Sequence, residues 1–198
     1  MRMKSGLAIL ALAGAAMAQG TYTIDKAHSS AQFSVRHMMI SNVKGAFSAV
    51  AGTIVYDPNN PAASKVDATI DVNSIDTREP KRDAHLKSPD FFDAAKYPSM
   101  EFHSKQAWKS GNNIQVKGDL TMHGVTKEVV LDVDGPTAEI KDPGGNMRIG
   151  ATATTKLNRK DWGLTWNRAL EAGGVMVGDE IAITLDIEAV KAVPPASK

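Results

Sequence analysis

Apolar and polar side chains alternate with a period of two along most of this chain. The clearest runs cover Val66–Asn73, Ile114–Met122 and Ile181–Glu188. A helix cannot place such residues on one face, because its period is 3.6 residues. Clean alternation predicts strands with one dry face and one wet face, which favours antiparallel over parallel sheets.

Weaker runs with the same period bring the predicted strands to about eight. They are Ala31–His37, Lys44–Tyr56, Met100–Lys105, Glu128–Val133 and Met147–Leu157. Turn-forming residues separate the runs, for example at Asp57–Pro61 and Ser110–Asn113. Strands without a helical layer must cover their edges and dry face, which leaves a sandwich or a closed barrel. Long strands with short turns favour an up-and-down barrel, and the pattern alone leaves open whether its interior is filled or hollow.

One segment, Asp76–Tyr97, interrupts the alternation with clustered aromatic and cationic residues. Thr77 is a candidate N-cap for a short helix carrying Arg78–Lys87, which Ser88-Pro89 would end. Insertions of this length in compact domains tend to be lids or binding loops. We therefore expect a short helical insertion at the mouth of an all-β barrel.

The two ends of the chain have different compositions from the middle. Arg2 and Lys4 precede a charge-free, Ala- and Leu-rich run that ends in Ala16-Met17-Ala18. This pattern predicts a cleaved signal peptide over residues 1–18 and a periplasmic protein. A single barrel domain is then expected over residues 19–191, followed by a flexible tail over 192–198.

Composition and motifs exclude several classes of function. The chain has 198 residues with 23 Lys+Arg against 22 Asp+Glu, so no basic field indicates nucleic-acid binding. Cysteine is absent, which excludes disulfides, thiol nucleophiles and cysteine-based metal sites. The five His residues have no metal-site spacing, and neither a nucleophile elbow nor a dinucleotide-binding motif is present.

Several short segments, each weak alone, resemble one family when taken in order. They are His28-Ser29, Phe33–His37, Ser74–Thr77, Arg82–Asp93, Tyr97-Pro98, Gly118–Thr126, Arg159–Gly163 and Val177–Ile181. The set resembles the YceI family of periplasmic polyisoprenoid-binding proteins over about Thr21 to Ala189. The resemblance implies an eight-stranded antiparallel lipocalin-like barrel with a hollow apolar interior. Its expected ligand is a long-chain isoprenoid or similar amphiphile, of the polyprenyl phosphate or quinone type.

The candidate ligand-binding residues fall into two groups. The apolar alternates expected to line the cavity are Phe33, Val35, Phe47, Ile70, Val72, Leu120, Met122, Ile149 and Ile183, although each could equally be ordinary core. In the insertion, Phe91 and Phe92 are expected to close over the tail. Arg82 and His85 are candidates for the head group, since a cation suits a phosphate and either can donate to a quinone carbonyl. The alternative for Arg82 is a structural pair with Asp83 that holds the insertion on the barrel.

These observations favour a carrier that sequesters a lipid without turnover, with no cofactor required beyond the bound polyisoprenoid or quinone-type lipid. An enzyme using the same cavity is one alternative, and a filled barrel acting as a stress or interaction module is another. An isoprenoid lipid is the expected partner and nucleic acid is not. The sequence leaves open a transient contact with a membrane or membrane protein, and a homodimer.

The inside and outside assignment can be tested at two adjacent residues. Ile70→Asp places a charge in the dry interior, so we expect it to abolish lipid binding or folding. Asp71→Asn, on the wet face, should be nearly silent. Circular dichroism and a lipid-binding assay on both variants check this, and equal effects would show that the assignment is wrong.

Overall fold

The computed structural model describes residues 19–171 and 173–193. The predicted signal peptide and residues 194–198 of the predicted tail lie outside the described residues. The elements are β1 (Gly20–Ile24), β2 (Ser30–His37), β3 (Ser41–Phe47), β4 (Val50–Tyr56), η1 (Pro61–Ala63), β5 (Lys65–Asp71), η2 (Val72–Ser74), β6 (Ile75–Asp76), α1 (Pro80–Lys87), β7 (Ser99–Ser110), β8 (Asn113–Met122), β9 (Val125–Asp134), β10 (Ile140–Lys141), β11 (Met147–Asn158), η3 (Arg159–Trp162) and β12 (Val177–Lys191). In this part of the chain, no helix has the length and apolar character needed to cross a membrane.

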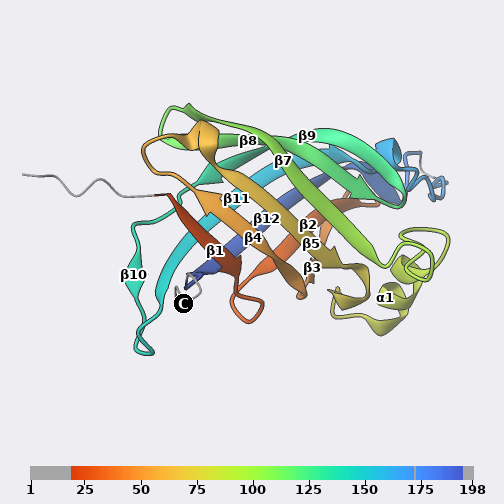
Figure 1. Ribbon diagram of the computed structural model, residues 1–198. Coiled ribbons are helices and arrows are strands. Elements are labelled where there is room, and N and C mark those ends of the chain that lie inside the picture. Colours follow the sequence, from red (N-terminus) through yellow and green to blue (C-terminus); the bar gives the residue numbers. More distant parts are fainter. Residues whose placement is uncertain (1–18, 172, 194–198) are drawn as a thin grey trace, which may run out of the picture.

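The strands form one antiparallel sheet that closes into a barrel (Figure 1). Strand β12 pairs with β11 on one side, and on the other with β2 through Val177–Asp186 and β1 through Ala189–Lys191. Strands β1 and β2 are therefore two parts of one barrel strand, as are β3 with β4 and β5 with β6. Together with β7, β8, β9, β11 and β12 they make eight barrel strands in up-and-down order. The predicted eight-stranded antiparallel barrel is confirmed.

The insertion helix α1 begins later than the sequence pattern suggested. Glu79 rather than Thr77 is its N-cap, and the Glu79 carboxylate accepts a hydrogen bond from the Lys81 amide at 3.1 Å. Arg78 has a φ of 63°, which is outside the helical range, and Pro80 suits the first helical turn because it lacks an amide hydrogen. The helix ends at Lys87, before Ser88, as expected.

Buried apolar residues form two clusters that differ in position. The larger cluster follows the inner faces of the strands and includes Phe47, Val50 and Phe102. The smaller one consists of Tyr22, Ile149 and Ala189, packed against Ile54 and Tyr56. These residues lie on β1, at the ends of β4 and β12 and at the start of β11, so the smaller cluster closes the end of the barrel opposite α1 (Figure 1).

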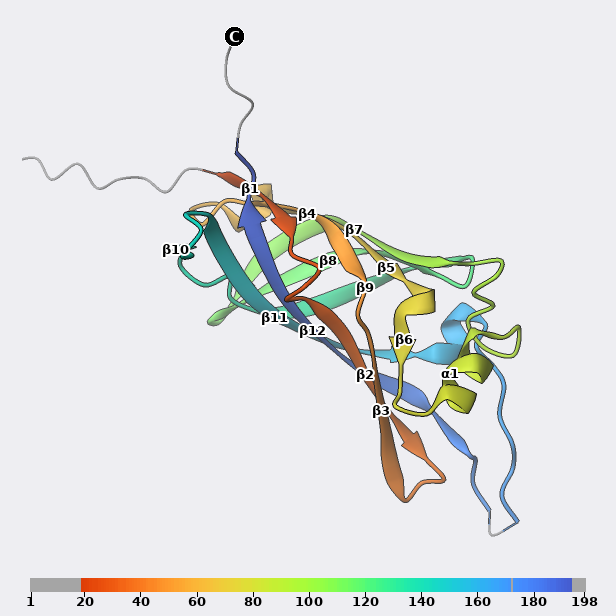
Figure 2. The same ribbon diagram turned by 90° about the horizontal axis from the view of Figure 1, so that it is seen from below.

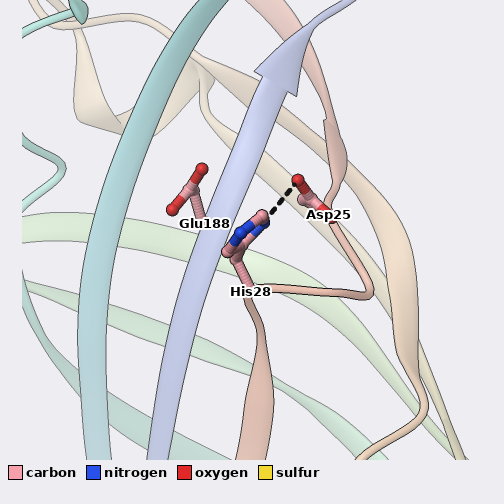
Figure 3. Close-up of side chains that lie close together, drawn as sticks. All are labelled: Asp25, His28 and Glu188. Atoms are coloured by element: carbon pink, nitrogen blue, oxygen red, sulfur yellow. Dashed lines mark hydrogen bonds and ion pairs between the residues drawn. The ribbon is translucent and has the colours of Figure 1, made fainter. Parts of the chain in front are cut away.

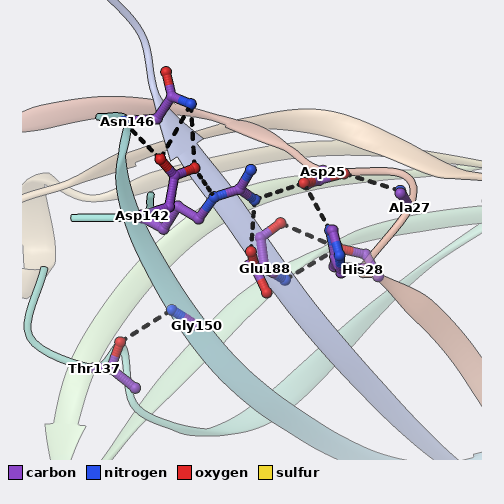
Figure 4. A network of polar contacts seen from close by, with 10 residues as sticks. Asp25, Ala27, His28, Thr137, Asp142, Asn146, Gly150 and Glu188 are labelled. Atoms are coloured by element: carbon purple, nitrogen blue, oxygen red, sulfur yellow. Dashed lines mark hydrogen bonds and ion pairs between the residues drawn. The ribbon is translucent and has the colours of Figure 1, made fainter. Parts of the chain in front are cut away.

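A polar network ties the turn between β1 and β2 to β11 and β12. Asp25, His28 and Glu188 lie close to one another, and the His28 ring bonds to the Asp25 carboxylate at 2.9 Å (Figure 3). The Arg148 guanidinium donates to Asp25 and Glu188, each at 2.6 Å. It also donates to Asp142 at 2.7 Å, and Figure 4 shows the three carboxylates gathered at this place. The network therefore fixes the turn between β1 and β2 against the neighbouring strands.

The same contacts shift the pKa values of the network's groups. The hydrogen bond from Arg148 lowers the pKa of Asp142 from its ordinary 3.8 to about 2, with further bonds from Asn146. Arg148 and His28 likewise hold the pKa of Asp25 far below its ordinary value. Because the folded-state pKa values are depressed, this stabilisation is complete above the ordinary carboxylate pKa and is lost as the pH falls from about 4 towards about 2.

The network predicts a specific acid response. In Arg148→Met the carboxylate pKa values rise towards their unfolded values, so we expect lower stability at pH 7. We also expect a smaller loss of stability between pH 4 and pH 2 than in the wild type. Urea unfolding across this range measures both effects. Lys156→Met removes the exposed pair with Glu180 at 2.9 Å and should leave the acid response unchanged. A wild-type response in Arg148→Met would contradict the assignment.

Candidate ligand-binding cavity

The barrel encloses a cavity of about 250 Å³. All eight barrel strands contribute inward-facing apolar residues to its wall, among them Ile24, Phe33, Ile54, Ala68, Phe102, Leu120, Val129, Ala153 and Leu185. This is the physical result of the alternation: each strand turns every second side chain inward, and the inward side chains are apolar. The interior is therefore hollow and almost entirely hydrocarbon-like.

Most residues predicted to contact a ligand lie in the cavity wall. They are Phe33, Val35, Phe47, Ile70, Leu120, Met122 and Ile183 from the strands, with Phe91 and Phe92 from the insertion. Their contact with a ligand stays a prediction. The alternative of ordinary core packing stays open, because Phe47, Phe91 and Met122 also belong to the larger buried cluster.

Val72 and Ile149 do not line the cavity, which corrects two predicted positions. The alternation on β5 stops at Asp71, whose carboxylate accepts from the Asn73 amide and starts the turn η2. Val72 is consequently 1% exposed and fully enclosed by core residues. Ile149 points inward but packs on Tyr22 and Ala189 beyond the closed end of the cavity.

Arg82 and His85 also lie outside the cavity wall. Arg82 donates to the hydroxyl and the carbonyl oxygen of Thr77, each at 2.8 Å, and Asp83 accepts from the amide of the same threonine at 2.9 Å. Arg82 and Asp83 thus hold Thr77 from both sides and fix the start of the insertion. His85 bonds to Asp90 at 2.8 Å. Contact of Arg82 or His85 with a head group stays a prediction.

The insertion covers the α1 end of the cavity with apolar side chains. Leu86, Phe91 and Phe92 line the cavity, and they come from α1 and the turn after it rather than from paired strands. Outside them, the Trp166 ring lies 5.2 Å from Phe91 and 4.9 Å from the ring of His85. The rings pack on the cover from outside, while backbone hydrogen bonds such as that from the Phe92 amide to the Leu86 carbonyl oxygen at 3.0 Å connect it internally rather than to a neighbouring strand.

Arg159 is the polar wall residue that sequence reasoning missed. It is 4% exposed and borders the cavity, and burial lowers its pKa. Its guanidinium donates to the carbonyl oxygens of Gly178, at 2.9 Å, and Leu164. Asp179 lies 3.4 Å away. In the sequence, Arg159 stands in a polar turn segment, and nothing there signals burial.

Other wall residues were absent from the predicted set although the alternation of apolar and polar positions already indicated them. Val66, Ala68, Leu185 and Ile187 occupy the same inward register as chosen neighbours on their strands and line the cavity. Leu86 lies on α1, where a single apolar position in a polar helix gives no indication of direction. The alternation thus identifies the wall better than any selection of individual residues from it.

Polar groups that could support metal binding or catalysis have structural partners in the described part of the chain. Asp25, His28 and Glu188 offer ligand atoms within 4.8 Å of one another, but Arg148 already places a cation against both carboxylates. Glu101, at the cavity edge, accepts from Ser99 at 3.4 Å and lies 3.8 Å from His103. No described titratable group faces the cavity without such a partner.

Comparison with known sequences gives a consistent assignment. The family model described as a YceI-like domain matches residues 22–189. A UPF0312 protein of Vibrio cholerae is 41% identical over 165 residues, covering 82% of this chain and 87% of the relative. A UPF0312 protein of Staphylococcus aureus is 36% identical over 167 residues, covering 84% and 95% of the two chains.

Solved structures share the fold. A Campylobacter jejuni YceI protein is 34% identical with a TM-score of 0.67, covering 79% of this chain and 90% of its own. A polyisoprenoid binding domain from Saccharophagus degradans has a TM-score of 0.62 at 16% identity, covering 86% and 98%. The second likeness concerns the fold alone. Taken with the family match over nearly the whole barrel, these relatives show that the chain belongs to the YceI-like family.

Proposed function

We propose that this protein binds a long-chain isoprenoid or similar amphiphile in its barrel cavity and carries it without chemical turnover. The observation that supports the proposal most directly is the hollow interior lined by apolar side chains from all eight barrel strands. Burial of a hydrocarbon contributes ~0.8 kcal/mol per methylene, so about ten buried carbons provide roughly 8 kcal/mol before the cost of ordering the chain. Tail binding therefore needs no hydrogen bond.

The size of the cavity constrains how a long chain is held. Its volume of about 250 Å³ lies just below the ~300–1,000 Å³ typical of sites for drug-sized molecules. A long prenyl chain thus occupies the interior only when wall side chains turn aside or when part of the chain remains at the entrance. The flexible side chains of Met100 and Met122, both in the wall, suit such an adjustment.

The α1 end is the entrance in this proposal. Strand β6 pairs with β3 but not with β7 within the described sheet, so the insertion interrupts the ladder between them. Displacing Leu86, Phe91 and Phe92 breaks ring contacts but no strand pairing. The opposite end is closed by Tyr22, whose hydroxyl donates to Glu139 at 2.5 Å.

Two further elements of the proposal come from outside the cavity. The pattern of residues 1–18 supports export to the periplasm, where a carrier would shield a lipid from water. Membership of the YceI-like family, together with the shared fold of a polyisoprenoid binding domain, supports a lipid ligand of the isoprenoid class. A polyprenyl phosphate or a quinone-type lipid fits both points.

Lipid extraction tests the proposal, with a matched pair of variants as control. Organic-solvent extraction of the purified protein followed by mass spectrometry should yield a prenyl lipid at close to one molecule per chain. Ala153→Phe puts a ring into the cavity and should reduce the bound lipid at least tenfold. Ala182→Phe makes the same change on the exposed outer face and should retain the lipid.

Two results would count against the proposal. One is a lipid-free protein that fails to bind added polyprenyl phosphate. The other is equal retention of lipid by Ala153→Phe and Ala182→Phe when both variants fold, because this would place the lipid outside the barrel.

A further inference from the structure

The hairpin between β2 and β3 carries an exposed apolar tip made of Met38, Met39 and Ile40. Ile40 is 75% exposed and Met39 is 53% exposed, which is unusual for three successive large apolar residues. The tip extends from the barrel at the end that carries α1, beside the segment that connects η3 to β12 (Figure 2). The Met38 amide donates to the Met176 carbonyl oxygen at 2.8 Å, so the two segments support each other.

The backbone of the tip is unfavourable for the residues it carries. Met38 and Met39 have φ values of 49° and 60°, and the Ile40 amide donates to the His37 carbonyl oxygen at 3.1 Å. Tight hairpin turns with two positive φ values strongly favour Asn and Gly. Two methionines in these positions are strained relative to Asn or Gly, and such strain points to a segment worth testing for function.

Cations without carboxylate partners flank the tip. Arg36 and Lys44 lie on the outward face of β2 and β3, and neither forms an ion pair in the described part of the chain. From Lys26 to Tyr56 the sequence contains three Lys or Arg residues and no Asp or Glu. Arg168, on the neighbouring segment, lies 5.9 Å above the Trp166 ring and is exposed. These three cations outnumber Glu171, an exposed carboxylate on the same segment as Arg168.

The tip also adjoins the cavity wall. Val35 and Val177 line the cavity, and His37 pairs with Val177 directly before the turn. The tip therefore lies within three residues of the cavity wall along β2. Because Phe91 and Phe92 cover the cavity at this same end, a surface that binds the tip would face the entrance.

We propose that the tip Met38–Met39–Ile40 inserts into the interface of an anionic lipid bilayer, with Arg36, Lys44 and Arg168 binding lipid phosphates. The surface area of three protruding side chains is far below the ~800 Å² that each partner buries in a stable protein–protein interface. This argues against a second copy of this chain as the occupant. A few apolar side chains flanked by cations are what interfacial anchoring uses. The inference deepens the proposed function, since it supplies the surface from which the lipid enters.

Vesicle sedimentation tests the docking. Wild-type protein should bind vesicles of equal parts phosphatidylglycerol and phosphatidylcholine. It should bind vesicles of phosphatidylcholine alone more weakly. The triple variant Met38→Asn, Met39→Gly, Ile40→Thr should bind at least tenfold more weakly. Its thermal stability should be equal or higher, because Asn and Gly suit the turn. Lys44→Gln should weaken binding to the anionic vesicles only.

A matched control removes a similarly exposed apolar residue elsewhere. Ile140, on β10 at the opposite end of the barrel, is 63% exposed, and Ile140→Thr should bind vesicles as the wild type does. Absence of wild-type binding, or equal binding by the triple variant, would overturn the proposal. A dimer in light scattering that the triple variant abolishes, without vesicle binding, would assign the tip to a second copy instead.

Loading assays separate this inference from the proposed function. Polyprenyl phosphate is offered either within vesicles or from dilute ethanol solution. If the triple variant loads from ethanol as the wild type does but slowly from vesicles, docking is supported. If both proteins load equally from vesicles, docking is refuted and the binding function stands. If wild type binds vesicles but retains no lipid from either source, only the binding function is refuted.

Discussion

Closure of the sheet by β12 is the constraint on which the rest of the structure depends. This strand pairs with β11 over Glu180–Val190 and with β2 and β1 on its other edge. Closure pairs β12 along both of its edges and turns the inward side chains of eight barrel strands towards a common space. Since these side chains are apolar and leave about 250 Å³ between them, the same closure creates a water-excluding cavity.

The two ends of the barrel are built differently, and this difference makes one end the entrance of the cavity. At one end Tyr22, Ile149 and Ala189 are tightly packed, and the Arg148 network outside them binds three carboxylates. At the other end the wall is completed by side chains of the insertion, held by the Thr77 contacts and by ring packing. The end closed by aromatic contacts therefore opens more easily than the end closed by charge and strand pairing.

The fold was largely predictable because its main signal is local. Alternation with a period of two requires only neighbouring residues, and eight such runs with short turns left few architectures. What it could not show is where a strand bends: Val72 fails as a wall residue because the Asp71 side chain caps a turn, and Ile149 because the register places it beside Tyr22. Arg159 was missed since its burial depends on carbonyl groups of Leu164 and Gly178, which only the folded chain brings together. The sequence also could not show whether the Arg82 guanidinium binds a protein group or a lipid head group, and the structure gives it Thr77 as its partner.

The account rests on a ligand inside the barrel, and two adjacent residues on β9 test this most directly. Val129 lines the cavity, whereas Val130 is exposed on the outer face. Nuclear Overhauser contacts between the methyl groups of bound polyprenyl phosphate and those of valine-labelled protein measure which face the lipid touches. The account predicts contacts to Val129 and none to Val130. Contacts to Val130 without contacts to Val129 would contradict it.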